Sequence, residues 1–330
     1  MRVAKRKKAK SKSGAVTAAL GRGIAATWRF IAKSLGKSVR LIARGARDLD
    51  PAHQRDGIAF LILIAALLCE TYYHWSIYII TVVFIGARYL ALGLLMHESV
   101  HGLISKNKKV NDIVGEVFCA WPVIVSMKSY KVKHLKHHQC LNTDEDPDYT
   151  AKTDKNWQFP MPISRFLKIV MRQLSGFGVF ETFRVMSGKS VTSKKPKSSM
   201  RYKFARVSFY IIVLGGFIYF DYEMLLLKYW LVPFISWTQL INRWRRIAEH
   251  SGIEHQPLEM QTRTTKHNFI SRLLLSPKNI SYHCEHHMFP SIPQYNLPKV
   301  HEKLVNNKMG RQSIYISKNY INVFNECIEK

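Results

Sequence analysis

The chain has 330 residues, 47% of them hydrophobic, and its 50 Lys and Arg residues against 22 Asp and Glu residues give a formal net charge of +28. A charge of this size attracts nucleic acid, anionic lipid or an acidic protein, and composition alone does not choose among them. The five cysteines are scattered without a Cys-x-x-Cys pair, which argues against a disulfide framework.

Residues 1–50 are predicted to form a basic tail that precedes one larger domain of residues 51–330. Fourteen Lys or Arg residues and no acidic residue lie between Arg2 and Arg47. The tail is typical either of an amphipathic helix on a membrane surface or of a disordered segment. We expect it to bind an anionic lipid surface rather than nucleic acid, because no recognisable nucleic-acid-binding fold accompanies it.

Two strongly apolar regions, residues 57–96 and 205–242, are each long enough for two membrane-spanning helices, since one crossing needs about 20 residues. We expect tight turns near Tyr72–Ser76 and Asp221–Glu223. The predicted fold class is therefore all-α, a membrane protein with four transmembrane helices in two hairpins. A soluble helical core is the alternative, because a basic residue interrupts each apolar region.

The distribution of Lys and Arg predicts which side of the membrane each part occupies. Both are frequent in the tail and in segments 97–203 and 243–330, whereas the two hairpin tips carry almost none. The positive-inside rule places both termini and both long segments in the cytoplasm. We therefore expect a multi-pass integral membrane protein whose cytoplasmic segments form a helical cap.

Two shorter apolar stretches are not predicted to be crossings. The stretch Ile113–Met127 is short and contains Pro122, which indicates a re-entrant or interfacial element. The stretch Ile163–Phe183 combines apolar residues at helical spacing with Lys and Arg, which predicts a helix lying on the membrane surface.

Most of the fourteen histidines fall into three groups with helical spacing. The first group has members at i and i+4, and the two later groups have members at i, i+3 and i+4, so each group shares a helix face. One more histidine follows the second apolar region by about two helical turns. The candidate metal ligands are His97, His101, His134, His137, His138, His250, His283, His286 and His287.

This number of imidazoles predicts two metal ions, because one tetrahedral zinc ion uses only four ligands. Neutral imidazole suits iron, zinc and copper. His97 and His250 are expected at the same membrane face, since the second and fourth helices both run toward the cytoplasm. Cys140 and Cys284 lie close to histidine groups in sequence but are predicted not to be ligands, because thiolate ligands usually come in spaced sets.

The three groups resemble the three histidine boxes of the integral-membrane fatty-acid desaturase family. The segment from Asn279 to His301 is especially similar to the third-box region, and the likeness extends from about Met96 to His301. The spacing of the first box resembles the lipid desaturase and carotenoid oxygenase branches more than the acyl-CoA branch. The resemblance implies two Fe2+ ions held by the nine histidines, and O2-dependent removal of hydrogens from adjacent methylenes to leave a double bond.

Polar residues near the histidines are candidates to orient them, because a ligating imidazole normally donates its other N–H to a carboxylate or carbonyl. The segment 142–148 is acidic within a basic chain, although a solvated turn at Pro147 explains it equally well. Among the remaining histidines, only His255 is placed in sequence to support His250. The candidate orienting residues are Glu98, Asp144, Asp146, Asp148, Glu249, Asn279 and Glu285.

The resemblance also implies partners: a membrane lipid or acyl substrate, O2, and a separate electron donor of the ferredoxin or cytochrome b5 type. If that donor is acidic, Lys194, Lys195 and Lys197 would assist its encounter with the chain. A lipid or carotenoid hydroxylase or ketolase on the same scaffold is the nearest alternative. A histidine-rich membrane metal transporter or sensor is less well supported, because the clustered histidines follow the crossings instead of lining a path through them.

Overall fold

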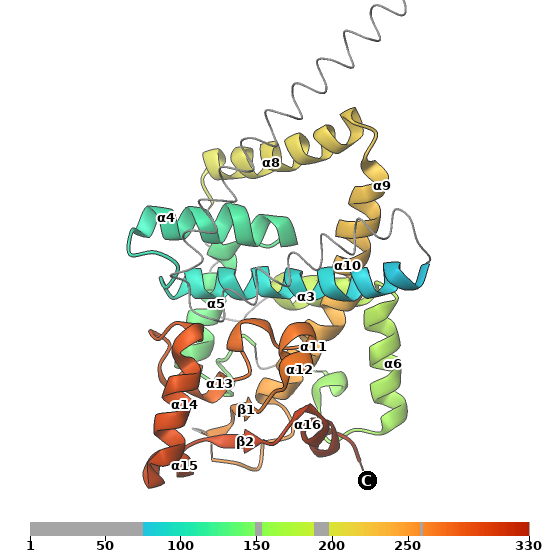
Figure 1. The fold of residues 1–330 in the computed structure, drawn as a ribbon. Helices are drawn as coiled ribbons and strands as arrows, with labels where there is room; N and C mark the ends of the chain where they lie inside the picture. The colour runs from blue at the N-terminus through green and yellow to red at the C-terminus, as the bar shows by residue number, and fades with distance from the viewer. Residues whose placement is uncertain (1–74, 149–153, 188–197, 258–259, 330) are drawn as a thin grey trace, which may run out of the picture. The chain divides into compact units, whose positions relative to one another are not determined.

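The computed structural model describes residues 75–148, 154–187, 198–257 and 260–329. In this part of the chain most residues are helical, as predicted (Figure 1). One small parallel sheet was not predicted: it pairs β1 (Arg263–Thr265) with β2 (Tyr315–Ser317). Strands of three residues are too short to display the alternation that identifies a strand in a sequence.

Helix α3 spans Trp75–Val100, and its 26 residues are long and apolar enough to cross a membrane. It begins inside the turn predicted at residues 72–76. Arg88, which interrupts the apolar stretch, donates from Nη2 to the carbonyl of Leu273 at 2.6 Å. The crossing predicted before α3, and the basic tail with its boundary at residue 50, lie outside the described residues.

Both helices predicted for the second apolar region are present, and the turn between them lies where it was expected. Helix α8 (Met200–Tyr219) begins where the Ser199 side chain accepts the Tyr202 N–H, and Asp221 turns the chain with a φ of 57°. The return arm, Glu223–His250, is long and apolar enough to span and reaches eight residues beyond the predicted end at 242. It is assembled from α9 (Glu223–Leu226), a π-helical segment η4 (Leu227–Leu231), α10 (Val232–Ile235) and α11 (Trp237–His250).

The stretch predicted to be re-entrant or interfacial is sharply bent. It follows α4 (Lys108–Ile113) and contains the π-helical η1 (Val114–Ala120) and the 3-10 turn η2 (Trp121–Val123). The segment Lys108–Val123 meets α5 (Met127–Gln139) at 100°. Ile124 makes the bend with a φ of 59°. With α3, α8 and Glu223–His250, the described residues contain three candidate spans, or four if this bent pair is one span.

The stretch predicted as one surface helix is two helices, α6 (Ile163–Leu174) and α7 (Gly178–Ser187). Gly176 separates them with a φ of 89°, a conformation that disfavours residues with a Cβ. One face of α6 packs inward through Phe166, whose ring lies 5.7 Å from that of Trp244 and 5.3 Å from that of Phe324. A second, exposed face is apolar and carries Ile163, Leu167, Met171 and Leu174.

A close approach between α3 and α11 positions the histidine-bearing ends of both helices. A Cβ on Gly86 would lie 2.9 Å from the Cβ of Trp237, so glycine lets the two backbones approach. The Thr238 hydroxyl donates to the Gly86 carbonyl at 3.2 Å. Ala87, Leu90, Leu94, Ile241 and Ile280 form the buried apolar core around this crossing.

The remaining elements are short, and one of them, α13, carries histidines (Figure 1). They are η3 (Lys155–Trp157), α12 (Phe269–Leu274), η6 (Pro277–Asn279), α13 (His283–Met288), η7 (Gln294–Asn296), α14 (Leu297–Asn306), α15 (Lys308–Gln312) and α16 (Tyr320–Cys327).

Candidate metal centre

All nine candidate histidines come together, in two groups. Within each group the ring nitrogens that face inward lie within 4.8 Å of one another. The five-histidine group consists of His97, His101, His134, His138 and His286. The four-histidine group consists of His137, His250, His283 and His287, and so includes His250, the one candidate ligand that belongs to none of the three sequence groups.

Two helices contribute to both groups, because their histidines are spaced at i, i+3 and i+4. On α5 the residues at i and i+4 face the five-histidine group, while His137 at i+3 faces the four-histidine group. On α13 the assignment is reversed, and only His286 at i+3 faces the five-histidine group. Helix α3 and the turn after it serve only the five-histidine group, whereas α11 supplies only His250 to the other.

The spacing of the imidazole nitrogens suits a shared metal ion in each group. In the five-histidine group, the Nε2 of His134 lies 2.9 Å from that of His101 and 3.0 Å from that of His138. In the four-histidine group, the Nε2 of His283 lies 2.9 Å from that of His250 and 3.1 Å from that of His287. Two nitrogens bound at right angles to one ion, with bonds of about 2.1 Å, would be about 3.0 Å apart. The donor set therefore fits one ion in each group.

The imidazoles on α13 are held in the neutral form that metal binding requires. Burial, followed by the neighbouring imidazoles, lowers the pKa of His283, His286 and His287 well below the ordinary value of 6.5. Desolvation penalises the charged imidazolium, so these rings keep a free lone pair at neutral pH.

Asp146 is the clearest of the predicted orienting residues. The Nδ1 of His137 lies 2.9 Å from each oxygen of this carboxylate. The carboxylate also accepts the N–H of Asn142 at 2.9 Å and the N–H of Asp148 at 2.8 Å. The acidic segment is thus a tight turn wrapped around the carboxylate that holds His137, and Asp144 is exposed on the same turn.

Glu98 and Glu249 lie close to the histidines without a direct hydrogen bond to them. Both carboxylate oxygens of Glu249 accept from Nη1 of Arg245, at 2.9 and 2.8 Å, and Oε1 lies 3.7 Å from Nδ1 of His283. Glu98 is 4.0 Å from Nδ1 of His97. Both carboxyl groups are buried, and they lie beside a centre whose nine ligands would all be neutral.

Two other predicted orienting residues hold groups other than the nine candidate ligands. The Asn279 side chain donates to the Gln294 carbonyl at 3.1 Å. The Glu285 carboxylate accepts from Nδ1 of His301 and from the Thr264 hydroxyl, each at 2.5 Å. His255, expected to support His250, is exposed, and its ring lies 6.4 Å from that of Tyr315.

Two contacts to the five-histidine group escaped prediction. The Tyr130 ring stacks on His134 with centroids 5.1 Å apart, and its hydroxyl is 3.4 Å from Nδ1 of that histidine. The Gln294 side chain lies 3.4 Å from Nδ1 of His97. Tyr130 precedes His134 by four residues, a spacing that could have identified it, whereas Gln294 is 197 residues from His97 and carries no such signal.

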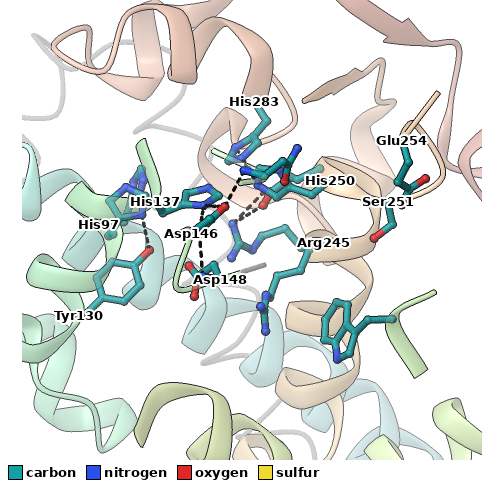
Figure 2. Close-up of a pocket in the computed structure, with 15 residues that line it drawn as sticks. His97, Tyr130, His137, Asp146, Asp148, Arg245, His250, Ser251, Glu254 and His283 are labelled. Atoms are coloured by element: carbon teal, nitrogen blue, oxygen red, sulfur yellow. Dashed lines mark hydrogen bonds and ion pairs between the residues drawn. The ribbon is translucent and has the colours of Figure 1, made fainter. Parts of the chain in front are cut away.

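An open pocket reaches both histidine groups (Figure 2). It is lined by members of both groups and by charged side chains, among them His97, His137, His283, Asp146, Asp148, Arg245, Arg246 and Glu249. A pocket with so many charged groups is suited to water and disfavours a hydrocarbon chain. The pocket therefore gives water and other small polar molecules a route to the histidines.

Comparison with known proteins agrees with this geometry. The family model described as fatty acid desaturase matches residues 73–319, a range that contains all nine histidines. The chain is 26% identical over 250 residues to Dihydrorhizobitoxine desaturase from Bradyrhizobium elkanii, covering 73% of this chain and 71% of that protein.

Two further relatives have the same level of identity. The match to Omega-6 fatty acid desaturase, chloroplastic, from Arabidopsis thaliana is 26% identical and covers 67% of this chain and 52% of that protein. The match to sn-1 acyl-lipid omega-3 desaturase (ferredoxin) from Nostoc sp. (strain 36) is 26% identical and covers 66% of this chain and 65% of that protein. The chain therefore belongs to the fatty acid desaturase family of oxidoreductases.

Proposed function

We propose that the chain is an O2-dependent di-iron desaturase that introduces a double bond into a fatty acyl chain of a lipid. The observation that carries this proposal is the convergence of nine imidazoles into adjacent groups of five and four. An all-imidazole donor set suits iron, and two groups suit two ions. The family relationship supports the acyl substrate and the use of O2.

The overall reaction is a four-electron reduction of O2. Two adjacent methylenes lose one hydrogen each, two electrons and two protons enter from outside, and the products are a carbon–carbon double bond and two water molecules. The two irons, when bound, would supply the oxidising chemistry for hydrogen removal. The nine histidines would hold them.

The residues around the histidines have separate tasks in this proposal. Asp146 fixes the ring orientation and tautomer of His137, as carboxylates do for ligating imidazoles. Tyr130 and Gln294 do the same, through longer contacts, for His134 and His97. The charged pocket would bring protons and release water, so that the acyl chain need not share that path.

We further propose that the protein is multi-pass, with both termini and the metal centre on the cytoplasmic side. The three candidate spans support membrane insertion. The exposed apolar face of α6 suits a helix lying on the membrane surface, where Arg165, Lys168 and Arg172 would meet lipid headgroups.

A separate electron donor completes the proposal. One relative's name specifies ferredoxin, and we propose a ferredoxin or cytochrome b5 type of donor for this chain. An acidic donor would be attracted by the net charge of +28. Lys194, Lys195 and Lys197, which we expect to assist that encounter, lie outside the described residues.

The experiment is expression in a host without desaturases, with metal and lipid analysis. The His286→Ala and His287→Ala double variant removes one ligand from each group, and exposed His255→Ala is the control. We expect two irons and a new unsaturated acyl species, both retained in the control and lost in the double variant. A hydroxylated or ketonic product would reassign the chain to the alternative oxygenases, and zinc with unchanged lipids would overturn the proposal.

A further inference from the structure

The strand β1 lies between two helices that carry histidines, although it has no histidine itself. All three of its residues are buried. One edge pairs with β2, and the other forms a bridge between Thr264 and Tyr282, the residue that precedes α13. The Thr265 N–H also donates to the Ser281 carbonyl at 2.9 Å. The strand is thus fixed by backbone hydrogen bonds on both edges.

Arg263 connects this strand to the end of α11. Its side chain is buried, and it donates to the carbonyls of Ala248 at 3.0 Å and Ser251 at 2.8 Å. These carbonyls lie at the C-terminal end of the helix, where no further turn supplies N–H partners. The same guanidinium donates to Glu326 on α16 at 2.6 Å. His250, the last residue of α11, lies between the two carbonyls in sequence.

Thr264 connects the strand to α13. Its hydroxyl donates to Glu285 at 2.5 Å, and this fully buried carboxylate stands between His283 and His286 in sequence. The Cys284 thiol adds a contact to the Thr262 carbonyl, with sulfur and oxygen 2.9 Å apart. Successive side chains of a strand point to opposite sides, so neighbouring residues can contact different helices.

We propose that β1 is a brace that sets the position of His250 relative to His283, with Arg263 and Thr264 as positioning residues and Glu326 as the anchor of the Arg263 arm. The proposal rests on the two-metal function proposed above. It assigns a task at the metal centre to the C-terminal helix α16, which carries no histidine. The Nε2 atoms of His250 and His283 are 2.9 Å apart, and the brace contacts the helix of each.

Loss of the Arg263–Glu326 contact and loss of the Thr264–Glu285 contact should have different effects on metal binding. The first contact holds α11 and the second holds α13, and these helices supply different histidine groups. Helix α11 supplies only His250, so a change at Glu326 should loosen the four-histidine group alone. Helix α13 supplies both groups, so a change at Thr264 should loosen both. Loss of residues that orient ligands typically weakens metal binding by about 10- to 100-fold.

The test measures metal bound per chain during titration with a chelator, together with thermal unfolding, on the full-length protein. Glu326→Gln should lose one ion at a roughly 10-fold lower chelator concentration while keeping the other, and Glu326→Asp should recover part of the loss. Thr264→Val should release both ions earlier. Glu181→Gln is the matched control. Glu181 lies on α7 and is the buried ion-pair partner of Arg243, which is on the same helix α11 as His250 but seven residues before it.

The control should lower the unfolding temperature and still retain both ions. The brace is overturned if Glu326→Gln and Thr264→Val release metal as the unmodified protein does, or if Glu181→Gln releases one ion as readily as Glu326→Gln. An unmodified protein that binds fewer than two ions would refute the proposed function itself. That result is read from the unmodified protein, so it is distinct from failure of the brace.

Discussion

The imidazole of His137 and the carboxylate of Asp146 form the shortest direct link between the four-histidine group and the acidic turn, with Nδ1 2.9 Å from both oxygens. The turn supplies two backbone N–H donors to the same carboxylate. Asp146 therefore stays in place when it accepts from His137, and its effect on the ring does not depend on a mobile side chain.

Replacing Asp146 with Asn should weaken metal binding in the four-histidine group by about 10- to 100-fold, because the ring of His137 loses its charged acceptor. Chelator titration with metal analysis measures the change. Asp144→Asn, at an exposed position on the same turn, should leave both ions bound. Equal metal retention in the two variants would contradict this role of Asp146.

Tyr130→Phe should have a smaller effect than Asp146→Asn. The substitution keeps the ring that stacks on His134 and removes only a hydroxyl at 3.4 Å from Nδ1, a distance at which hydrogen bonds are weak. We expect less than a 10-fold loss of affinity, confined to the five-histidine group. Chelator titration with metal analysis measures the change in affinity. A loss of affinity larger than that of Asp146→Asn would contradict the weak role assigned to the hydroxyl.

Gly86 and Gly93 on α3 should respond in opposite directions to substitution by Ala. A Cβ at Gly86 meets Trp237 at 2.9 Å and the backbone of Thr238 at 3.1 Å, so we expect a destabilisation of about 1–3 kcal/mol. A Cβ at Gly93 meets nothing within 4 Å, and Ala there should gain roughly 0.5–1 kcal/mol from its higher helix propensity. Unfolding temperatures in the same detergent compare the two, and a shift of the same sign would contradict the tight α3–α11 contact.

The metal-free protein should lose stability as the pH falls below about 6.5. Burial lowers the pKa of His283, His286 and His287 in the folded chain, so between the folded and unfolded values the unfolded chain binds more protons. Stability then rises with pH through this window and is lost on acidification. Thermal unfolding of the metal-free protein between pH 8 and 5 measures the slope, which should be shallower in the His286→Ala and His287→Ala variant.

The sequence predicted the site better than it predicted the elements that support it. The spacing of the histidines along α5 and α13 was sufficient, because helix geometry alone decides which neighbours share a face. Asp146 was among the three candidate aspartates of the acidic turn, but only the structure distinguishes it from Asp144 and Asp148. Gln294 could not be identified from the sequence, because its approach to His97 depends on how η7 packs against the end of α3.

The predictions that differ from the structure do so because local sequence patterns do not reveal tertiary contacts. The stretch around Gly176 has an apolar pattern that continues through the break, so periodicity alone predicts one helix where there are two. Glu285 was selected for its position between two histidines, yet its carboxylate accepts from His301 and Thr264. Helical spacing places a residue on a face but does not say which tertiary partner that face meets. The ligand roles of the histidines, the identity of the metal and the sidedness of the membrane remain predictions.

Because α5 and α13 each contribute to both groups, we expect metal binding in one group to affect metal binding in the other. An ion in the five-histidine group would fix the positions of both helices, and with them His137, His283 and His287 of the other group. The second ion would then bind to a site of which three ligands are already ordered, at a smaller cost in conformational entropy. We expect positive cooperativity between the two ions, so that each group should bind its ion more tightly when the other group is loaded.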